Sequence, residues 1–305
     1  MEKHRKKLIK NAAVFDGHSS GLAQGKKIVI EDDIVTEITA GEVSEENFDE
    51  VFDGTGMVAM PGMTDAHVHM GCLFAKGEFP VDYATVLTVA KCKDALMAGF
   101  TTFRDAGSVS EGLKLAFDEG VLLGPRIYPC GAYISQMCGH GDSEYAHTYC
   151  DIQYRHPSSA VLADGVPEII RAVREQFYRG ASHIKLMATE ILNRHEDIRL
   201  LFGTDMMITG PDYQVEQSED IRYYEKRFGT MRALRALTGT ANEVFALTTY
   251  QNPYPKGKIG VLEAGSYADL LLVDGDPTKR VSVLADTDHL RLIMKWGTVY
   301  KNTLC

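Results

Sequence analysis

The stretch MPGMTDAHVHMG, residues 60–71, places two histidines one residue apart at the end of an apolar run. Alternate side chains of a β-strand share a face, so Asp65, His67 and His69 are predicted to point the same way. Two imidazoles on one face can bind a single ion, because imidazole is a common ligand of zinc, iron, nickel and copper. A pair of ordinary surface or core histidines is the alternative interpretation. The stretch predicts a strand that ends in a candidate metal site.

The chain around this strand alternates between two patterns. Between residues 60 and 248, apolar strand-like runs alternate with helical patterns, as in the βαβ units of a parallel sheet. The fold class is therefore α/β, with a core derived from a TIM barrel. The predicted strands are 56–70, 99–107, 125–135, 183–189 and 198–205. The predicted helices are 83–99, 166–181 and two short helices within 229–247.

The two flanking regions have a different texture. Short alternating runs there end in Asp-Gly, Gly and Pro turn signals, which are typical of antiparallel strands. We predict that residues 1–59 and 249–305 combine into a small composite β-sandwich domain. Residues 60–248 then form the barrel domain.

Composition limits the classes of function. The chain has 305 residues, of which 45% are hydrophobic and 24% charged, as in ordinary globular proteins. A formal charge of −10 disfavours nucleic acid as a partner, since phosphates are bound by basic patches. No apolar run approaches the roughly 18 residues that span a bilayer, and no secretion-signal pattern follows the first residues. We expect a cytoplasmic protein that acts on a small molecule, without a membrane partner.

A lysine lies inside one of the predicted strands. In HIKLMAT, residues 183–189, the alternation places Lys185 on the same face as His183, pointing into the barrel. A buried ammonium must be paired or chemically changed. It can act as a nucleophile, or take up carbon dioxide to give a carbamate that bridges metals. The alternative is a lysine that extends its ammonium to the rim of the barrel.

A carboxylate follows the last predicted strand. Asp205 comes directly after the Gly-Thr pair in LLFGTDMM. As a metal ligand it could also take a proton from water and return it to a leaving group. Aspartate after glycine is also common in simple turns, so this motif gains its meaning from the other candidates.

Four further residues are lesser candidates, and three of them, Arg104, Tyr133 and His140, are candidates for substrate contact. Arg104 and Asp105 end the strand in TTFRDAG, where a structural ion pair between them is the alternative. His140 lies between glycines in a long loop, and Tyr133 precedes that loop. Loops that follow barrel strands line the active sites of such folds.

Taken together, these motifs resemble the metal-dependent amidohydrolase superfamily, in its imidazolonepropionase and Xaa-Pro dipeptidase-like branch. The resemblance rests on residues 60–71, 99–107, 131–142, 163–189, 202–205 and the run GKIGVLEAGSYADLLLVDGDP, residues 257–277. It implies that His67, His69 and Asp205 bind one divalent metal, with zinc the first choice. It further implies that Lys185, as a carbamate, bridges to a second metal and that Asp205 is the catalytic proton shuttle.

The sequence departs from this superfamily between Lys185 and Asp205. Relatives take two more metal-binding histidines from strands in this interval, but His195 is the only histidine there. A βαβ unit needs about 30 residues, so the interval is too short for the strands that would close the barrel. We expect an incomplete barrel with an internal deletion and a doubtful second metal. Open sheet edges invite pairing, so a homo-oligomer is an option.

Three functions remain open. The first is hydrolysis of a C–N bond in an amide, cyclic amide or dipeptide by metal-activated hydroxide. The second is a catalytically impaired or inactive relative that lacks the second-metal histidines. The third is a deaminase-type hydrolase, which would need a further histidine from the same interval.

Overall fold

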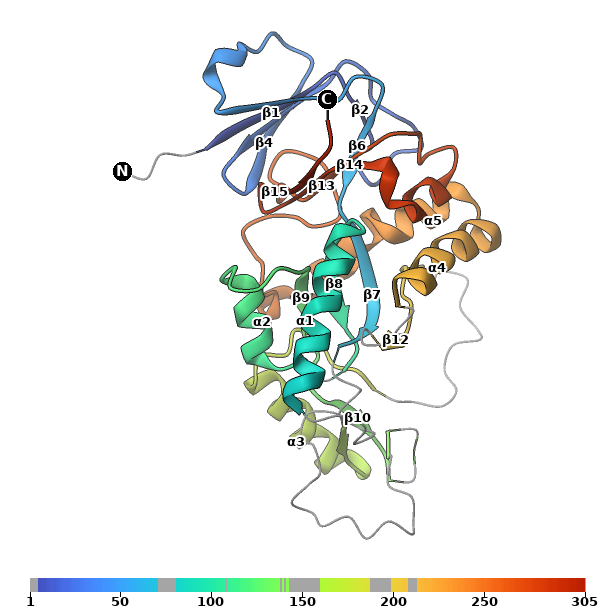
Figure 1. Cartoon of the computed structure of the whole chain (residues 1–305). Coiled ribbons are helices and arrows are strands. Elements are labelled where there is room, and N and C mark those ends of the chain that lie inside the picture. The colour runs from blue at the N-terminus through green and yellow to red at the C-terminus, as the bar shows by residue number, and fades with distance from the viewer. Residues whose placement is uncertain are drawn as a thin grey trace.

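The computed structural model describes residues 5–70, 81–107, 109–137, 139, 141–142, 160–186, 199–207 and 213–304. The elements form a mixed α/β fold, which confirms the predicted class. Figure 1 shows the strands of the first sixty residues beside β13, β14 and β15 at one end of the molecule. From there β7 and β8 run toward the opposite end, where β10 and α3 lie.

A parallel sheet carries the histidine motif. Its strand order is β12-β7-β8-β9, with all three pairs parallel. The strands are β7 (Met63–His69), β8 (Phe100–Asp105), β9 (Arg126–Tyr128) and the short β12 (Met206–Met207). Nearly every residue of β7 is buried, as in a parallel sheet covered on both faces. The described residues contain no closed barrel.

Helices pack beside these strands. α1 (Val81–Met97) precedes β8, and α2 (Glu111–Asp118) precedes β9. The hydroxyl of Ser110 accepts a hydrogen bond from the Leu113 amide and so caps α2, a helix that the apolar pattern did not predict. α3 (Gly165–Tyr178) matches its prediction. It follows a small parallel pair, β10 (Tyr133–Ser135) with β11 (Ala160–Leu162).

The region after β12 is helical. α4 (Tyr213–Phe228) was not predicted, because its sequence is mostly charged and polar and lacks a clear apolar stripe. α5 (Thr230–Leu237) and α6 (Gly239–Phe245) are the two short helices expected within residues 229–247. The 3₁₀ segments are η1 (Glu45–Asn47), η4 (Ala246–Gln251), η5 (Val281–Ala285) and η6 (Thr287–His289).

Two of the strand predictions were wrong within the described residues. Residues 199–205 lie along β7 without entering the ladder, and only Met206–Met207 pair as a strand. Of the predicted strand 183–189, residues 183–186 are described, and Leu186 alone makes an isolated bridge, to Ile134. Both segments are apolar enough to form a strand, but only one or two residues of each form backbone pairs with a neighbouring strand.

The β-rich flanks form two sheets. The first has the order β4-β3-β1-β5 and the second β15-β14-β13-β6-β2. Side chains of both, such as Ile28, Val35, Leu270 and Leu292, share one apolar core. The strands are β1 (Lys6–Lys10), β2 (Ala13–Val14), β3 (Lys27–Glu31), β4 (Ile34–Thr39), β5 (Glu50–Asp53), β6 (Val58–Pro61), β13 (Leu270–Val273), β14 (Leu290–Lys295) and β15 (Thr298–Asn302). The domain boundaries after residues 59 and 248 stay a prediction.

A buried ion pair joins the β-rich part to the parallel sheet. Arg126 on β9 is fully buried and its guanidinium contacts the carboxylate of Asp269, which is also buried. The rings of Tyr267 and Trp296 lie 4.4 and 4.7 Å from the centre of the guanidinium. Asp269 also accepts a hydrogen bond from the Trp296 amide at 2.7 Å. Because both charges are removed from water, loss of one partner would leave the other buried and unpaired.

No helix in the described part of the chain has the length and hydrophobicity that crossing a membrane requires.

A second buried cation beside this pair predicts a pH dependence of stability. Lys295 is 1% exposed, and burial, followed by repulsion from Arg126, lowers its pKa from 10.5 to about 8. Because the folded pKa lies below the unfolded one, this group destabilises the fold increasingly as pH falls from 10.5 to about 8, and fully below that. As pH rises from about 8 to 10.5, the free energy of unfolding of the native protein should therefore increase by about 3 kcal/mol relative to that of Lys295→Met. Denaturant titrations at several pH values measure it.

The matched control is Lys279→Met, whose side chain is 84% exposed in the native protein. Its difference from the native protein should not change with pH over the same window. A Lys295→Met difference that is equally flat would contradict the buried-cation interpretation.

Candidate metal centre

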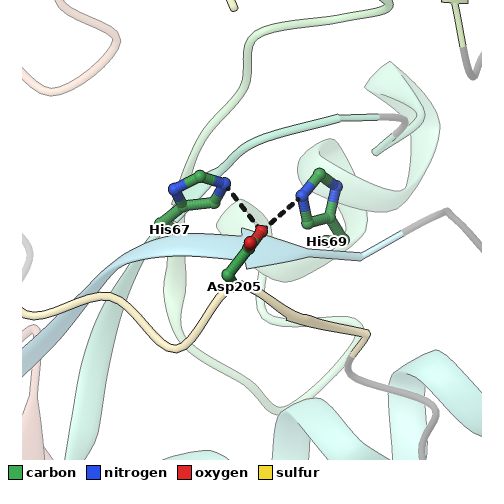
Figure 2. A group of neighbouring side chains, drawn as sticks. All are labelled: His67, His69 and Asp205. Carbon is green, nitrogen blue, oxygen red and sulfur yellow. Dashed lines mark hydrogen bonds and ion pairs between the residues drawn. The ribbon is translucent and has the colours of Figure 1, made fainter. Parts of the chain in front are cut away.

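Two histidines and one aspartate converge at the end of β7. Nε2 of His67 lies 3.0 Å from Oδ1 of Asp205, and Nε2 of His69 lies 3.1 Å from the same oxygen. Figure 2 shows both rings turned toward this carboxylate. His69 is buried, His67 is half-buried, and the side chain of Asp205 is 72% exposed. The three ligand atoms lie within 4.8 Å of one another, and among the described residues this is the one such group.

The backbone holds Asp205 against β7. The Ala66 amide donates to the Phe202 carbonyl at 2.8 Å, and the Asp205 amide donates to the His67 carbonyl at 2.7 Å. Phe202 is fully buried, which anchors the segment in the core. Asp205 itself has φ +56°, a left-handed conformation that aspartate tolerates better than most residues. This backbone bend directs its carboxylate at the two imidazoles.

Gly203 allows this close approach. A Cβ at this position would lie 2.7 Å from Cβ of His67 and 3.2 Å from its backbone nitrogen. No ordinary side chain fits at such distances without moving one of the two segments. The glycine of the FGTD motif is therefore required by the spacing between residue 203 and the first histidine.

Asp65 does not join the cluster, contrary to the prediction that it shares a face with the histidines. Its carboxylate accepts hydrogen bonds from the Thr204 hydroxyl at 2.9 Å and from the Gln217 amide at 3.2 Å. The register between β7 and β8 shifts between Asp65 and Val68, so strict alternation fails here. Burial raises the pKa of Asp65 to about 7, although these hydrogen bonds oppose the shift.

Lys185 approaches the same cluster from the segment after α3. Its Nζ lies 2.7 Å from Nε2 of His67. Burial and then the nearby Lys185 charge lower the pKa of His67 well below the usual value, which favours the neutral imidazole. A neutral imidazole is the form that binds metals. The ammonium and a metal would compete for the same lone pair, so metal binding through Nε2 requires Lys185 to move or to lose its charge.

The substrate candidates fall at different places. Tyr133 on β10 is buried beside Gly107, where an added Cβ would lie 2.6 Å from the tyrosine ring and 3.5 Å from Nδ1 of His69. Nη1 of Arg104 donates to the Ala66 carbonyl at 3.3 Å. His140 lies outside the described residues, as does His195.

Asp105 makes no described ion pair with Arg104. Its carboxylate accepts backbone hydrogen bonds from Met70 at 3.1 Å and from Gly107 and Val109 at 3.2 Å each. These bonds fix the residue that follows His69. Burial raises the pKa of Asp105 to about 7. The alternative interpretation, an ion pair between Arg104 and Asp105, is therefore wrong within the described residues. The two side chains bind separate backbone groups.

Two residues that support the cluster escaped the sequence analysis. Thr204 and Gln217 both bond to the Asp65 carboxylate, and the Thr204 amide also donates to it at 3.3 Å. Thr204 stands in the FGTD motif, so its position was visible although its role was not. Gln217 lies on the unpredicted α4, and no motif marks it.

The donor set fits a divalent transition metal. Two imidazole nitrogens and one carboxylate oxygen are ligands that zinc accepts, and three protein ligands with an open side are typical of catalytic zinc. The exposure of Asp205 provides that open side.

Comparison with known proteins agrees with this geometry. Residues 58–197 match the sequence model of the amidohydrolase family. An ochratoxinase of Aspergillus niger is 34% identical over 152 residues, which are 43% of this chain and 31% of that protein. The chain thus matches about a third of that relative's length. An imidazolonepropionase of Picrophilus torridus is 39% identical over 67 residues, 21% of this chain and 16% of the relative.

Solved structures show the same fold. The crystal structure of one amidohydrolase aligns with a TM-score of 0.84 at 22% identity, covering 98% of this chain and 100% of that chain. A prolidase complexed with N-methylphosphonate-L-proline aligns with a TM-score of 0.83 at 22% identity, covering 97% and 100%. The fold, together with a His-His-Asp cluster at the end of β7, is similar to that of solved amidohydrolases. The chain is thus similar to the amidohydrolase family over residues 58–197 of its sequence, and it shares the fold of solved amidohydrolases.

The contact at Gly203 generates a prediction. Gly203→Ala should push the 202–205 segment away from β7 and lower the affinity for zinc by about 10-fold, as changes around metal ligands typically do. Competition with a chromophoric chelator measures the affinity. Gly112→Ala is the control, because its added Cβ meets nothing within 4 Å. Equal zinc affinities in the two variants would show that Asp205 is not held as described.

Proposed function

We propose that this chain is a metal-dependent hydrolase that cleaves a C–N bond in an amide, a cyclic amide or a dipeptide. The observation that carries the proposal is the convergence of His67, His69 and Asp205, with His69 and Asp205 separated by 136 positions in the chain. Buried supporting groups around a carboxylate that is itself open to solvent are what a hydrolytic site needs. Zinc is the proposed metal.

The chemistry divides between the metal and the chain. A divalent ion bound here would supply Lewis-acid activation of water and of the scissile carbonyl. Asp205 would take the proton from the attacking water and deliver it to the leaving nitrogen, since its carboxylate is solvent-accessible. His67 and His69 would hold the metal, and the backbone bonds of residues 202–205 would keep the carboxylate in place.

Lys185 is proposed as a further ligand in modified form. Its uncharged amine would add carbon dioxide and release a proton, which gives an anionic carbamate. The position of Nζ, 2.7 Å from Nε2 of His67, supports this because an ammonium there repels a metal whereas a carbamate attracts one. A second ion would then bind to the carbamate.

The substrate is proposed to be a small molecule or a dipeptide. A relative is called an ochratoxinase, and a structural neighbour is a prolidase bound to a proline derivative. Tyr133 and Arg104, and His140 from outside the described residues, are the proposed substrate contacts. Within the described part of the chain β12 is an outer strand of its sheet, and an edge of this kind can pair with another chain, so a homo-oligomer is part of the same proposal.

One alternative has a specific observation in its favour. The described residues contain a single three-ligand cluster and no second histidine pair near Lys185. A relative that binds at most one metal and has little turnover would show this arrangement. A deaminase-type reaction would need another histidine, although a 5'-deoxyadenosine deaminase of Methanosarcina acetivorans is 42% identical over 72 residues.

Metal content separates these possibilities. We expect at least one zinc ion per chain after purification with zinc, and none in the double variant His67→Ala, His69→Ala, because both imidazoles are lost. Elemental analysis of purified protein measures it. Metal-free native protein would contradict the proposal, and two ions per chain would support the Lys185 carbamate.

Turnover tests the role of the carboxylate. Asp205→Asn should lower kcat by about 10²-fold or more, because the amide cannot accept a proton. Rates on N-acyl amino acids, Xaa-Pro dipeptides and lactams measure it. Asp274→Asn is the control, since that side chain is 56% exposed and pairs with Arg291 on the surface. Equal rates for native and Asp205→Asn protein would mean that the activity does not arise here.

A further inference from the structure

A cavity lies next to the metal centre, on residues that the centre does not use. Its volume is about 360 Å³, within the range of small-molecule sites. Arg104 of β8 and Tyr128 of β9 form one wall, and His183 forms another. Segment η4 (Ala246–Gln251) closes the far side with residues 247–251. Arg104 and His183 connect the cavity to the centre, since Arg104 bonds to the Ala66 carbonyl and His183 precedes Lys185 by two positions.

Arg104 contributes an uncompensated charge to this cavity. The side chains that line it include no aspartate or glutamate. Among the described residues, the one hydrogen bond assigned to its guanidinium goes to the Ala66 carbonyl. A guanidinium has five N–H donors and stays charged in proteins, so most of its donors can serve a ligand. Asp105, its chain neighbour, has its carboxylate on backbone amides instead.

The other walls suit an apolar body. The rings of Tyr128 and Phe245 stack with centroids 3.9 Å apart and an interplanar angle of 3°. These two rings are buried behind the wall, and the rings that a ligand can reach are Phe177, from the end of α3, and the exposed Tyr250. Thr249, in the closing segment, has φ 47° and ψ −120°, a conformation that costs of order 1–3 kcal/mol and is concentrated at ligand sites. The cavity thus combines one cation with aromatic surface and a strained wall.

We propose that this cavity binds a small organic carboxylate with an aromatic or branched apolar body, its carboxylate on Arg104 and its body against Phe177 and Tyr250. Arginine and carboxylate groups match in a two-point geometry, which orders the ligand as well as attracting it. The interpretation of this carboxylate as a substrate or product rests on the proposed function. The presence of the cavity and of the Arg104 charge does not depend on that function.

The test uses a matched pair of probes and no turnover. Hydrocinnamate carries a phenyl ring and a carboxylate, and its amide has the same shape without charge. We expect the native protein to bind the acid at least about 10-fold more tightly than the amide, because a bond to a charged group replaces a neutral one. Isothermal titration calorimetry measures both. Arg104→Met should remove this preference, whereas Arg222→Met, on the exposed side of α4, should keep it.

A second variant decides the case if Arg104→Met does not fold. Leu247 lines the cavity but is 65% exposed, so Leu247→Glu should fold and place a like charge at the rim. Leu247→Glu should bind hydrocinnamate about 10-fold more weakly than Leu247→Gln does, and both variants should bind the amide with the same affinity. Equal binding of acid and amide to native protein would overturn the proposal, as would unchanged acid binding in Leu247→Glu.

Chelation separates this cavity from the histidine cluster. The affinity for hydrocinnamate should be the same before and after treatment with a chelator, because Arg104 needs no metal to bind a carboxylate. Loss of binding on chelation would place the carboxylate on the metal instead and would overturn the inference. Metal-free protein that still binds the acid would leave the inference standing even where the hydrolase proposal had failed.

Discussion

The candidate site depends on one backbone contact, the docking of residues 202–205 along β7. Two hydrogen bonds, Ala66 to Phe202 and Asp205 to His67, place a carboxylate opposite imidazoles that lie far away in the sequence. The contact is possible because Gly203 has no side chain, and it is stable because Phe202 is buried. Without it, β7 would present two histidines and no third ligand. The candidate site therefore depends on how residues 202–205 bind to the edge of β7 as much as on the three side chains themselves.

A second layer of polar groups holds this contact in place. Asp65 receives bonds from Thr204 and Gln217, and thereby ties β7 to both the docked segment and α4. Asp105 receives three backbone amides and fixes the chain beyond His69. Buried carboxylates with several donors rigidify their surroundings, because loss of any donor would leave a charge or a lone pair without a partner. The exposed Asp205 is thus supported by two carboxylates that are not themselves exposed.

The sequence predicted the parts that follow local rules. Alternation placed His67 and His69 together, and helical periodicity located α1, α3, α5 and α6. Local rules failed where long-range contacts decide. Asp65 left the predicted face because the β7–β8 register shifts, and residues 199–205 dock as an irregular segment although their composition favours a strand. α4 was missed because its contacts use polar side chains such as Gln217, which hydropathy does not distinguish from surface residues.

The five-stranded sheet has a consequence for synthesis. In this sheet β6 lies between β2 and β13, so one of its edges is completed by residues 270–273. A nascent chain on the ribosome exposes β6, whose four residues are all buried in the folded protein, until those residues emerge. During that interval the open edge can pair with another nascent chain or be shielded by a chaperone. Because residues 270–273 are translated long after β6, the synthesis of β13, rather than of the parallel sheet, ends this exposure to aggregation.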